Sequence, residues 1–232
     1  MVHIWSFRTS RPPGEVETLA RLLNDEELAR ARRMRSLEVR EQTLVGRAVC
    51  RKFLGAYLNQ DPARLEFDQT GMGKPILHGR PELHFNLTHS HGIALLAITR
   101  LAEVGVDIEL VRLLPNTRFL AERFFSGREA SELSAYQGEE LAQVFFQTWT
   151  RKEAFLKANG SGIGFGLDRV EVSFGHGETP RIRFIDGSES KAKKWTVIHL
   201  EPGKGFMGAV ALEAPVVAIK TGFWNGGERL FP

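Results

Sequence analysis

Apolar and polar residues alternate along two stretches of the chain, which is the pattern of a half-buried β-strand. The first stretch is near the start, at residues 2–7. In the second, at residues 104–110, three apolar residues alternate with Gly105, Asp107 and Glu109. Successive side chains of a strand point to opposite faces, so this second strand presents both carboxylates on one face.

Apolar residues recur at helical spacing in several longer stretches. Asn24 with Glu27, and Ser126 with Glu129, have the spacing of capping boxes, which open two further helices. Asn159-Gly160 predicts the end of a helix, because both residues tolerate the left-handed conformation found there. The predicted helices span residues 15–23, 37–58, 117–125 and 139–158.

Short apolar runs bounded by turn residues predict the remaining strands, at residues 65–67, 75–77, 83–87, 93–99, 170–174, 182–185, 195–200 and 206–212. These strands do not alternate regularly with helices, as they would in a doubly wound parallel sheet. We therefore predict an α+β fold with two similar subdomains, residues 1–103 and 104–232. The glycine-rich segment at residues 221–232 is either a packed tail or a loose end.

The composition is that of a folded protein without membrane spans. The 232 residues are 42% apolar and 25% charged, which is ordinary for a globular protein. No apolar run approaches the roughly 20 residues that a membrane helix needs, and the alternating start lacks the features of a signal peptide. We expect a soluble, cytoplasmic protein. Cys50 is the single cysteine, and its apolar neighbours predict a buried, inert thiol rather than a nucleophile.

The net charge of +3 is small, but arginines are concentrated between Glu27 and Lys52. This segment is either a solvated helix face or an anion site with two or three arginines pointing inward. Nucleic acid is a weaker explanation, because the excess is confined to one segment and no nucleic-acid motif accompanies it. We expect no nucleic-acid partner.

Asp107 and Glu109 either point to solvent or form a site. Like charges two residues apart repel each other unless a proton or a cation lies between them. Mg²⁺ suits a few carboxylates together with phosphate oxygens and water, whereas zinc requires more histidine or cysteine. The pair therefore favours a magnesium site over a zinc site.

The helix from Trp149 to Lys157 contains further charged residues. Glu153 and Lys157 are four residues apart and therefore neighbours on one face. Taken alone, this segment is an amphipathic surface helix with one ion pair. The aromatic residues around Lys152, Glu153 and Lys157 favour partial burial and a role in a site.

Two upstream segments also carry polar residues next to turns. Lys74, between Gly73 and Pro75, can meet a phosphate, although the same residues also form an ordinary turn. His89 and His91 are a weak zinc signal, because no third histidine or cysteine is near them in the sequence. Hydrogen bonds from Thr88 and His89 to a phosphate explain this segment more simply.

Together these motifs resemble the signature of the Sfp-type phosphopantetheinyl transferases. The similarity rests on four segments in the order of that family: Gly73-Lys74-Pro75, Phe85-Asn86-Leu87-Thr88-His89-Ser90, Gly105-Val106-Asp107-Ile108-Glu109, and W-x-x-K-E-x-x-x-K from Trp149 to Lys157. The resemblance implies two α+β subdomains related by pseudo-twofold symmetry. It also implies transfer of the phosphopantetheine arm of coenzyme A to a serine of an acyl or peptidyl carrier protein, with release of adenosine 3′,5′-bisphosphate. A chain of this length is expected to act as a monomer.

The resemblance further implies roles for individual residues. It assigns Mg²⁺ to Asp107, Glu109 and Glu153. Glu153 is expected to act as the base and Lys157 to offset the leaving-group charge, so that catalysis would depend on Asp107, Glu153 and Lys157. The implied coenzyme A contacts are Thr88, where the family has serine, His89, Lys74, Lys152, Lys157 and Arg30, with Arg33 and Arg47 as alternatives to Arg30 at the 3′-phosphate.

Other functions remain open on the residues alone. The carboxylates and lysines also permit another magnesium-dependent enzyme acting on a diphosphate. A non-catalytic module that binds coenzyme A or a nucleotide is a second alternative, and a basic RNA-binding protein is a remote third. The motifs do not encode which carrier protein is used or where it docks.

Overall fold

The two halves of the chain have the same order of elements in the computed structural model, apart from one short extra helix in the second half. The structure describes residues 1–175, 177–215 and 217–227. The first half contains β1 (Val2–Arg8), α1 (Pro13–Ala20), α2 (Asp25–Arg32), α3 (Leu37–Leu58), β2 (Phe67–Gln69), β3 (Pro75–Leu77), β4 (His84–Ser90) and β5 (Ile93–Thr99). The second half contains β6 (Val104–Leu110), α4 (Thr117–Phe124), α5 (Gly127–Leu133), α6 (Gly138–Asn159), β7 (Val170–Val172), β8 (Ile182–Ile185), α7 (Glu189–Ala192), β9 (Thr196–Leu200) and β10 (Phe206–Leu212). One more strand, β11 (Ile219–Trp224), follows.

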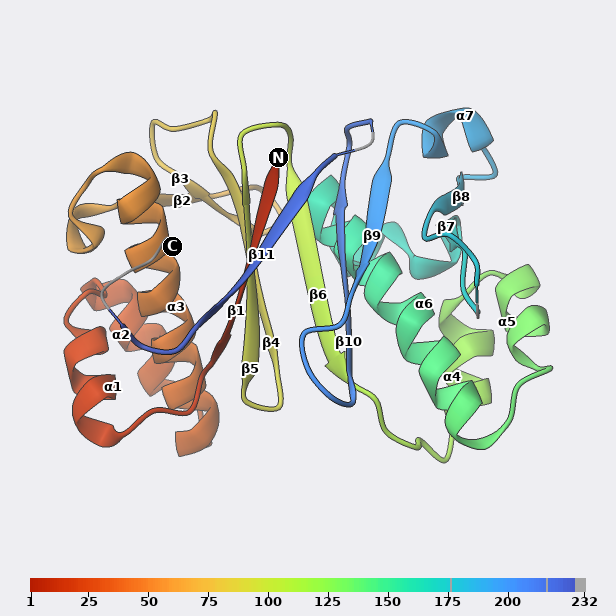
Figure 1. Ribbon diagram of the computed structural model, residues 1–232, viewed down its shortest axis with the longest axis horizontal. Coiled ribbons are helices and arrows are strands. Elements are labelled where there is room, and N and C mark those ends of the chain that lie inside the picture. Colours follow the sequence, from red (N-terminus) through yellow and green to blue (C-terminus); the bar gives the residue numbers. More distant parts are fainter. Residues whose placement is uncertain (176, 216, 228–232) are drawn as a thin grey trace.

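The main sheets of the two halves also have the same strand order. In the first half the strand order is β1-β5-β4, and in the second half it is β6-β10-β9, so each half pairs its first strand with its last. All of these pairings are antiparallel. Figure 1 shows the strands of these two sheets in the middle of the molecule, with α1–α3 on the outer side of one sheet and α4–α6 on the outer side of the other. The predicted α+β fold with two similar halves is confirmed.

The caps that the sequence predicts are present. Asn24 and Glu27 form a capping box at α2, and Ser126 and Glu129 form one at α5. Helix α6 ends at Gly160, whose backbone is left-handed with φ of 72°. These local interactions fix where the helices begin and end.

The two halves share a hydrophobic core. The apolar face of β6 packs between the sheets, as the alternation of its residues predicts. This cluster draws on both halves, with Val2, Ile4, Leu95 and Ala97 from one and Val104, Val106, Ile108, Leu200, Val210 and Leu212 from the other. Asn86 adds a polar link, since its Oδ1 accepts a hydrogen bond of 2.9 Å from the backbone N–H of Val106. The site-bearing strand is therefore held against the first half.

The described part of the C-terminal segment, residues 219–224, is packed rather than loose. Strand β11 runs parallel to β1 and extends the sheet of the first half, with Phe7 opposite Trp224. Gly222 lies against the ring of Trp5, where a Cβ would come within 2.2 Å of a ring carbon. Residues 228–232 of the predicted tail lie outside the described residues. The division into residues 1–103 and 104–232 stays a prediction.

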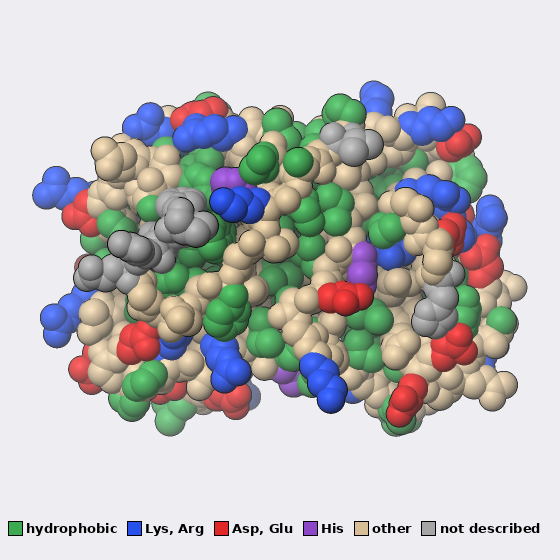
Figure 2. All heavy atoms as spheres, viewed as in Figure 1, with side chains coloured by type: hydrophobic (Ala, Val, Ile, Leu, Met, Phe, Trp, Pro, Cys, Tyr) green, Lys and Arg blue, Asp and Glu red, His purple; other side chains and the backbone are tan. Residues whose placement is uncertain are grey.

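Two expectations from composition can be compared with the structure. None of the helices in the described ranges is long and apolar enough to cross a membrane. Cys50 is buried in α3, as predicted. On the face shown in Figure 2, Lys and Arg side chains are spread around the edge of both halves and mixed with Asp and Glu.

Candidate active site

Strand β6 presents its two carboxylates to α6, because side chains alternate along the strand. Gly105 precedes them on the same face, and α6 lies directly against it. A Cβ on Gly105 would fall 2.1 Å from the carbonyl oxygen of Ala154 and 2.4 Å from the backbone nitrogen of Ala158. Only glycine permits this approach, which brings the Lys157 side of α6 over Asp107.

Asp107 lies at the centre of the predicted group. Its Oδ1 atom is 2.5 Å from Nζ of Lys157 and accepts a 3.4 Å hydrogen bond from Oγ1 of Thr88. Nζ of Lys157 is also 3.2 Å from Oγ1 of Thr88. Side chains from β4, β6 and α6, and thus from both halves, meet at one carboxylate.

Burial and mutual repulsion make this cluster receptive to positive charge. Asp107 is 5% exposed, and burial raises its pKa to about 6, opposed by Lys157 and reinforced by the negative charges of Glu153 and Glu109. Burial likewise raises the pKa of Glu153, opposed by Lys157 and reinforced by Glu109. The three carboxylates therefore interact electrostatically, although they lie on two separate elements.

A divalent ion fits the chemistry of this donor set. The second oxygen of Asp107, Oδ2, is buried without a hydrogen-bond partner among the described residues. Oxygen donors with excess negative charge are what Mg²⁺ prefers. The three carboxylates do not form a complete metal site in this structure. No three His, Cys, Asp or Glu residues in the described ranges are close enough together to hold an ion.

Two of the three carboxylates, Asp107 and Glu109, make hydrogen bonds or ion pairs with other side chains. Lys157 pairs with Asp107. Glu109 accepts a 3.1 Å hydrogen bond from the hydroxyl of Ser90, and its Oε2 is 3.8 Å from Nη1 of Arg112. Sequence reasoning gave neither Ser90 nor Arg112 a role. Ser90 could have been found, because it is two residues from Thr88 on the same face of β4.

One cavity lies beside this cluster, and a second cavity shares a wall with the first. The first, of about 270 Å³, is lined by Glu153 and Lys157 together with Gly73, Lys74 and Pro75. The second, of about 60 Å³, is lined by Arg30 and Arg47 together with Gly73 and Pro75. The residues 73–75 segment thus separates an arginine-lined pocket from the carboxylate cluster, and Arg33 is not among the residues that line either cavity.

Lys74 lines the larger cavity, but its charge is already paired. Its Nζ atom is 2.5 Å from Oε2 of Glu103 and donates a 3.0 Å hydrogen bond to the carbonyl of Val104. The other oxygen of Glu103 contacts His84 at 2.9 Å. Lys74 therefore contributes its backbone and aliphatic chain to the cavity wall.

Lys152 lies apart from the carboxylate cluster, whereas His89 interacts electrostatically with Lys157 of the cluster. His89 is on β4, with an exposed surface, and partial desolvation together with the charge of Lys157 lowers its pKa. Lys152 is fully buried on another face of α6, with Nζ 2.5 Å from Oε2 of Glu129 and 2.8 Å from the carbonyl of Leu167. This burial and pairing argue against the predicted contact of Lys152 with a bound phosphate.

The hydrogen bonds of Lys152 give this motif lysine a structural role. All three hydrogens of its ammonium have acceptors, the third being the carbonyl of Val170. Glu129 also accepts a 2.8 Å hydrogen bond from the backbone N–H of Val172. The pair connects α5, α6 and β7. The sequence showed only the capping box of Glu129, and no signal pointed to its pairing across the core.

Two family models match the chain in succession. Residues 103–211 match the model described as the 4′-phosphopantetheinyl transferase superfamily. Residues 10–100 match the model described as the N-terminal part of 4′-phosphopantetheinyl transferase.

Curated relatives carry the same description. The 4′-phosphopantetheinyl transferase HetI of Nostoc sp. is 36% identical over 214 residues, which cover 91% of this chain and 87% of that protein. The 4′-phosphopantetheinyl transferase Sfp of Bacillus subtilis is 30% identical over 171 residues, covering 73% and 75%. The human L-aminoadipate-semialdehyde dehydrogenase-phosphopantetheinyl transferase is 28% identical, covering 74% and 61%.

Proposed function

The chain belongs to the 4′-phosphopantetheinyl transferase superfamily, and we propose that its two halves together transfer the phosphopantetheine arm of coenzyme A to a serine of an acyl or peptidyl carrier protein. The enzyme class follows from the family. The proposal for the residues rests on one observation, the meeting of Thr88, Asp107 and Lys157 from both halves beside a cavity that shares a wall with an arginine-lined pocket.

Coenzyme A has a nucleotide end and a pantetheine end joined by a pyrophosphate, so its site must offer positive charge at two places. Arg30 and Arg47 supply it in the 60 Å³ pocket, which suits the 3′-phosphate. Lys157 and Thr88 supply donors at the pyrophosphate, and His89 adds a ring nitrogen on the same strand. Lys74 belongs to the segment between the proposed 3′-phosphate pocket and the proposed pyrophosphate site.

The carboxylates of Asp107, Glu109 and Glu153 are the residues proposed to hold Mg²⁺. Their excess negative charge and the unpartnered Oδ2 of Asp107 support this assignment. When bound, the ion supplies positive charge to the pyrophosphate oxygens. Because Lys157 contacts only Oδ1, Oδ2 of Asp107 would be available to the ion while Lys157 stays at the wall of the adjoining cavity.

The transfer forms one bond and breaks one. The serine oxygen bonds to the phosphorus that carries pantetheine, while the bond from that phosphorus to the bridging oxygen breaks. The bridging oxygen departs on adenosine 3′,5′-bisphosphate, and the serine proton passes to a base. Lys157 is placed to stabilise the charge that develops on the departing oxygen.

Glu153 is the proposed base. Burial raises its pKa, with Lys157 opposing and Glu109 adding to the shift, and a carboxylate with a raised pKa is a better proton acceptor. Glu153→Gln removes the base while keeping an oxygen ligand. We predict normal coenzyme A binding by calorimetry and a fall in turnover of about a hundredfold or more, the range that general bases contribute. Full turnover in this variant would show that another group takes the proton.

One chain contains both sides of the site, which supports action as a monomer; light scattering of the active protein tests this. A cytoplasmic location is part of the same proposal and is tested by cell fractionation. The subdomain division at residues 103/104 is tested by whether separately expressed halves restore activity when mixed.

Incubation with coenzyme A, Mg²⁺ and an apo carrier domain separates the function classes. Transfer predicts a mass gain of one phosphopantetheine group on the carrier serine. Breakdown of coenzyme A without a modified carrier would favour a hydrolase acting on a diphosphate. Binding of coenzyme A that survives Asp107→Ala, without any modified carrier from the wild-type protein, would favour a non-catalytic module.

A further inference from the structure

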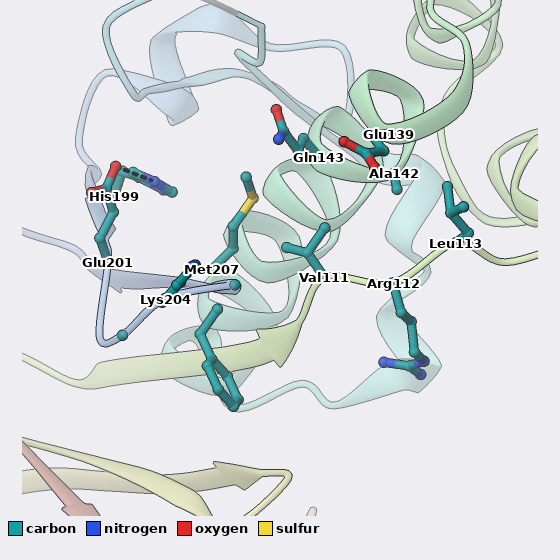
Figure 3. Close-up of a pocket in the computed structure, with 13 residues that line it drawn as sticks. Val111, Arg112, Leu113, Glu139, Ala142, Gln143, His199, Glu201, Lys204 and Met207 are labelled. Carbon is teal, nitrogen blue, oxygen red and sulfur yellow. Dashed lines mark ion pairs between the residues drawn. The ribbon is translucent and has the colours of Figure 1, made fainter.

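A third cavity, of about 680 Å³, lies on the second half. None of the residues proposed to bind Mg²⁺ or coenzyme A lines it. It opens between the end of β6, the start of α6 and the turn from β9 to β10 (Figure 3). Met207 points into it from β10, Val111 from the segment that follows β6, and Gln143 from α6, as Figure 3 shows. This cavity is larger than the two beside residues 73–75.

The cavity begins next to the carboxylate cluster. Arg112 lines it, and Nη1 of Arg112 is 3.8 Å from Oε2 of Glu109. Met207, on the cavity wall, is paired with Glu109 across β10 and β6. Paired residues of antiparallel strands share a face and lie about 5 Å apart. The wall of the cavity is therefore one strand away from a proposed metal ligand.

The cluster lies between this cavity and the one beside residues 73–75. Glu153 and Lys157 line the 270 Å³ cavity, whereas Gln143 lines the 680 Å³ cavity. All three residues are on α6, and a helix rises about 1.5 Å per residue, so Gln143 and Glu153 are separated by roughly 15 Å along its axis. The two cavities thus lie at opposite ends of the contact between α6 and β6.

We propose that the 680 Å³ cavity is the docking site of the carrier protein, which inserts an apolar side chain near its reactive serine. This inference rests on the proposed function. In phosphoryl transfer the attacking and leaving oxygens lie roughly in line on opposite sides of phosphorus. The nucleotide departs on the side of residues 73–75, so the serine oxygen must arrive from the side of Glu109 and Arg112.

The lining of the cavity fits a protein partner. Its floor is apolar, with Val111, Ala142 and Met207, and its rim carries charges of both signs. An apolar centre with a charged rim is the usual anatomy of a protein interface. Leu113 extends this surface, since it lines the cavity and is 66% exposed. The rim charges are Arg112, Glu139, Glu201 and Lys204.

Kinetics with two substrates test the docking site. Leu113→Asp places a charge on the apolar surface, and Lys204→Glu reverses an exposed rim charge. We expect each variant to raise the KM for an apo carrier domain at least tenfold while the KM for coenzyme A stays within twofold. Phe223→Asp is the matched control, because Phe223 is 59% exposed on β11 of the other half; it should change neither constant.

Crosslinking gives a second measurement that does not depend on turnover. Because Cys50 is buried, Leu113→Cys creates a single accessible thiol for a photo-crosslinking label. We expect the labelled protein to capture an apo carrier domain, and the Phe223→Cys control not to. Wild-type transfer with an unchanged carrier KM in both charge variants, or equal capture at the two cysteines, overturns the docking site alone. No transfer by the wild-type protein overturns the proposed function itself.

Discussion

The backbone of α6 lies so close to Gly105 that this residue sets the geometry of the site. Gly105→Ala would put a methyl group 2.1 Å from the carbonyl of Ala154, so the helix must move away from β6. We predict a loss of about 1–3 kcal/mol in the free energy of unfolding, the usual cost of overpacking. Carrier modification should fall much more than stability, because Glu153 and Lys157 move with the helix.

Gly127→Ala is the matched control for this prediction. Nothing lies within 4 Å of a Cβ built on Gly127, which opens α5. Urea unfolding and the rate of carrier modification should both remain near wild-type values. The same wild-type result for Gly105→Ala would contradict the close approach of α6 to β6.

Cys50 is the second case in which a single residue decides an outcome. It is 2% exposed in α3, and burial raises its pKa to about 12. At pH 8 the thiol is therefore neutral as well as inaccessible, and thiolates are the reactive form. A disulfide-based thiol reagent should modify the folded protein far more slowly than the urea-unfolded protein. Equal rates in both states would show that the thiol is accessible.

Helix α6 carries charged residues with different surroundings at adjacent positions. Glu153 and Lys157 face β6, whereas Lys152 faces the core and pairs with Glu129. Lys152→Met leaves the Glu129 carboxylate buried without its cation, and breaking such a pair typically costs about 3–5 kcal/mol. We predict this loss in urea unfolding, followed by a loss of activity as the helix is displaced.

The double variant Lys152→Met/Glu129→Gln separates the structural role from ligand binding. Removing both charges eliminates the uncompensated carboxylate, so most of the stability lost in the single variant should return. If Lys152 contacted coenzyme A instead, the single variant would raise the KM for coenzyme A without lowering stability.

Periodicity predicted most of the elements but less of the site. The bounds of α3, β5, β6 and β10 follow from apolar spacing and turn residues alone. Strand β11 was not recognised, because its pairing with β1 joins the two ends of the chain and leaves no local pattern. Alternation along β6 placed Asp107 and Glu109 on one face, and the four-residue spacing on α6 did the same for Glu153 and Lys157. The contact of Asp107 with Lys157 comes from the structure, because helical and strand periods do not say which residues of two elements meet. The position of Lys152 follows from the same helical geometry, since adjacent helical residues point about 100° apart.

Strand β11, near the end of the chain, pairs with β1 near its start. Trp224, on β11, is buried against Phe7 and Phe53 of the first half. Trp224→Ala should cost about 3–5 kcal/mol, the usual loss for a buried tryptophan. Phe223→Ala, at an exposed position next to it, should change stability by less than about 0.5 kcal/mol. Similar unfolding midpoints for the two variants would contradict a packed β11.

The arrangement of the two halves explains why the site lies where it does. Thr88 comes from the first half, and Asp107 and Lys157 come from the second. Their contact depends on the core that the sheets share around Val106. The same packing therefore holds Thr88 of one half and Asp107 and Lys157 of the other in contact.

The rate of phosphopantetheine transfer by Asp107→Ala tests the central claim most directly. Intact-mass measurement of an apo carrier domain, with coenzyme A and Mg²⁺, follows the reaction for the variant and the wild-type protein. Asp107 contacts Lys157 and Thr88 and interacts electrostatically with Glu109 and Glu153. We therefore predict full modification by the wild-type protein and at least a hundredfold slower transfer by the folded variant. Transfer by the variant at the wild-type rate would contradict the assignment of this cluster as the active site.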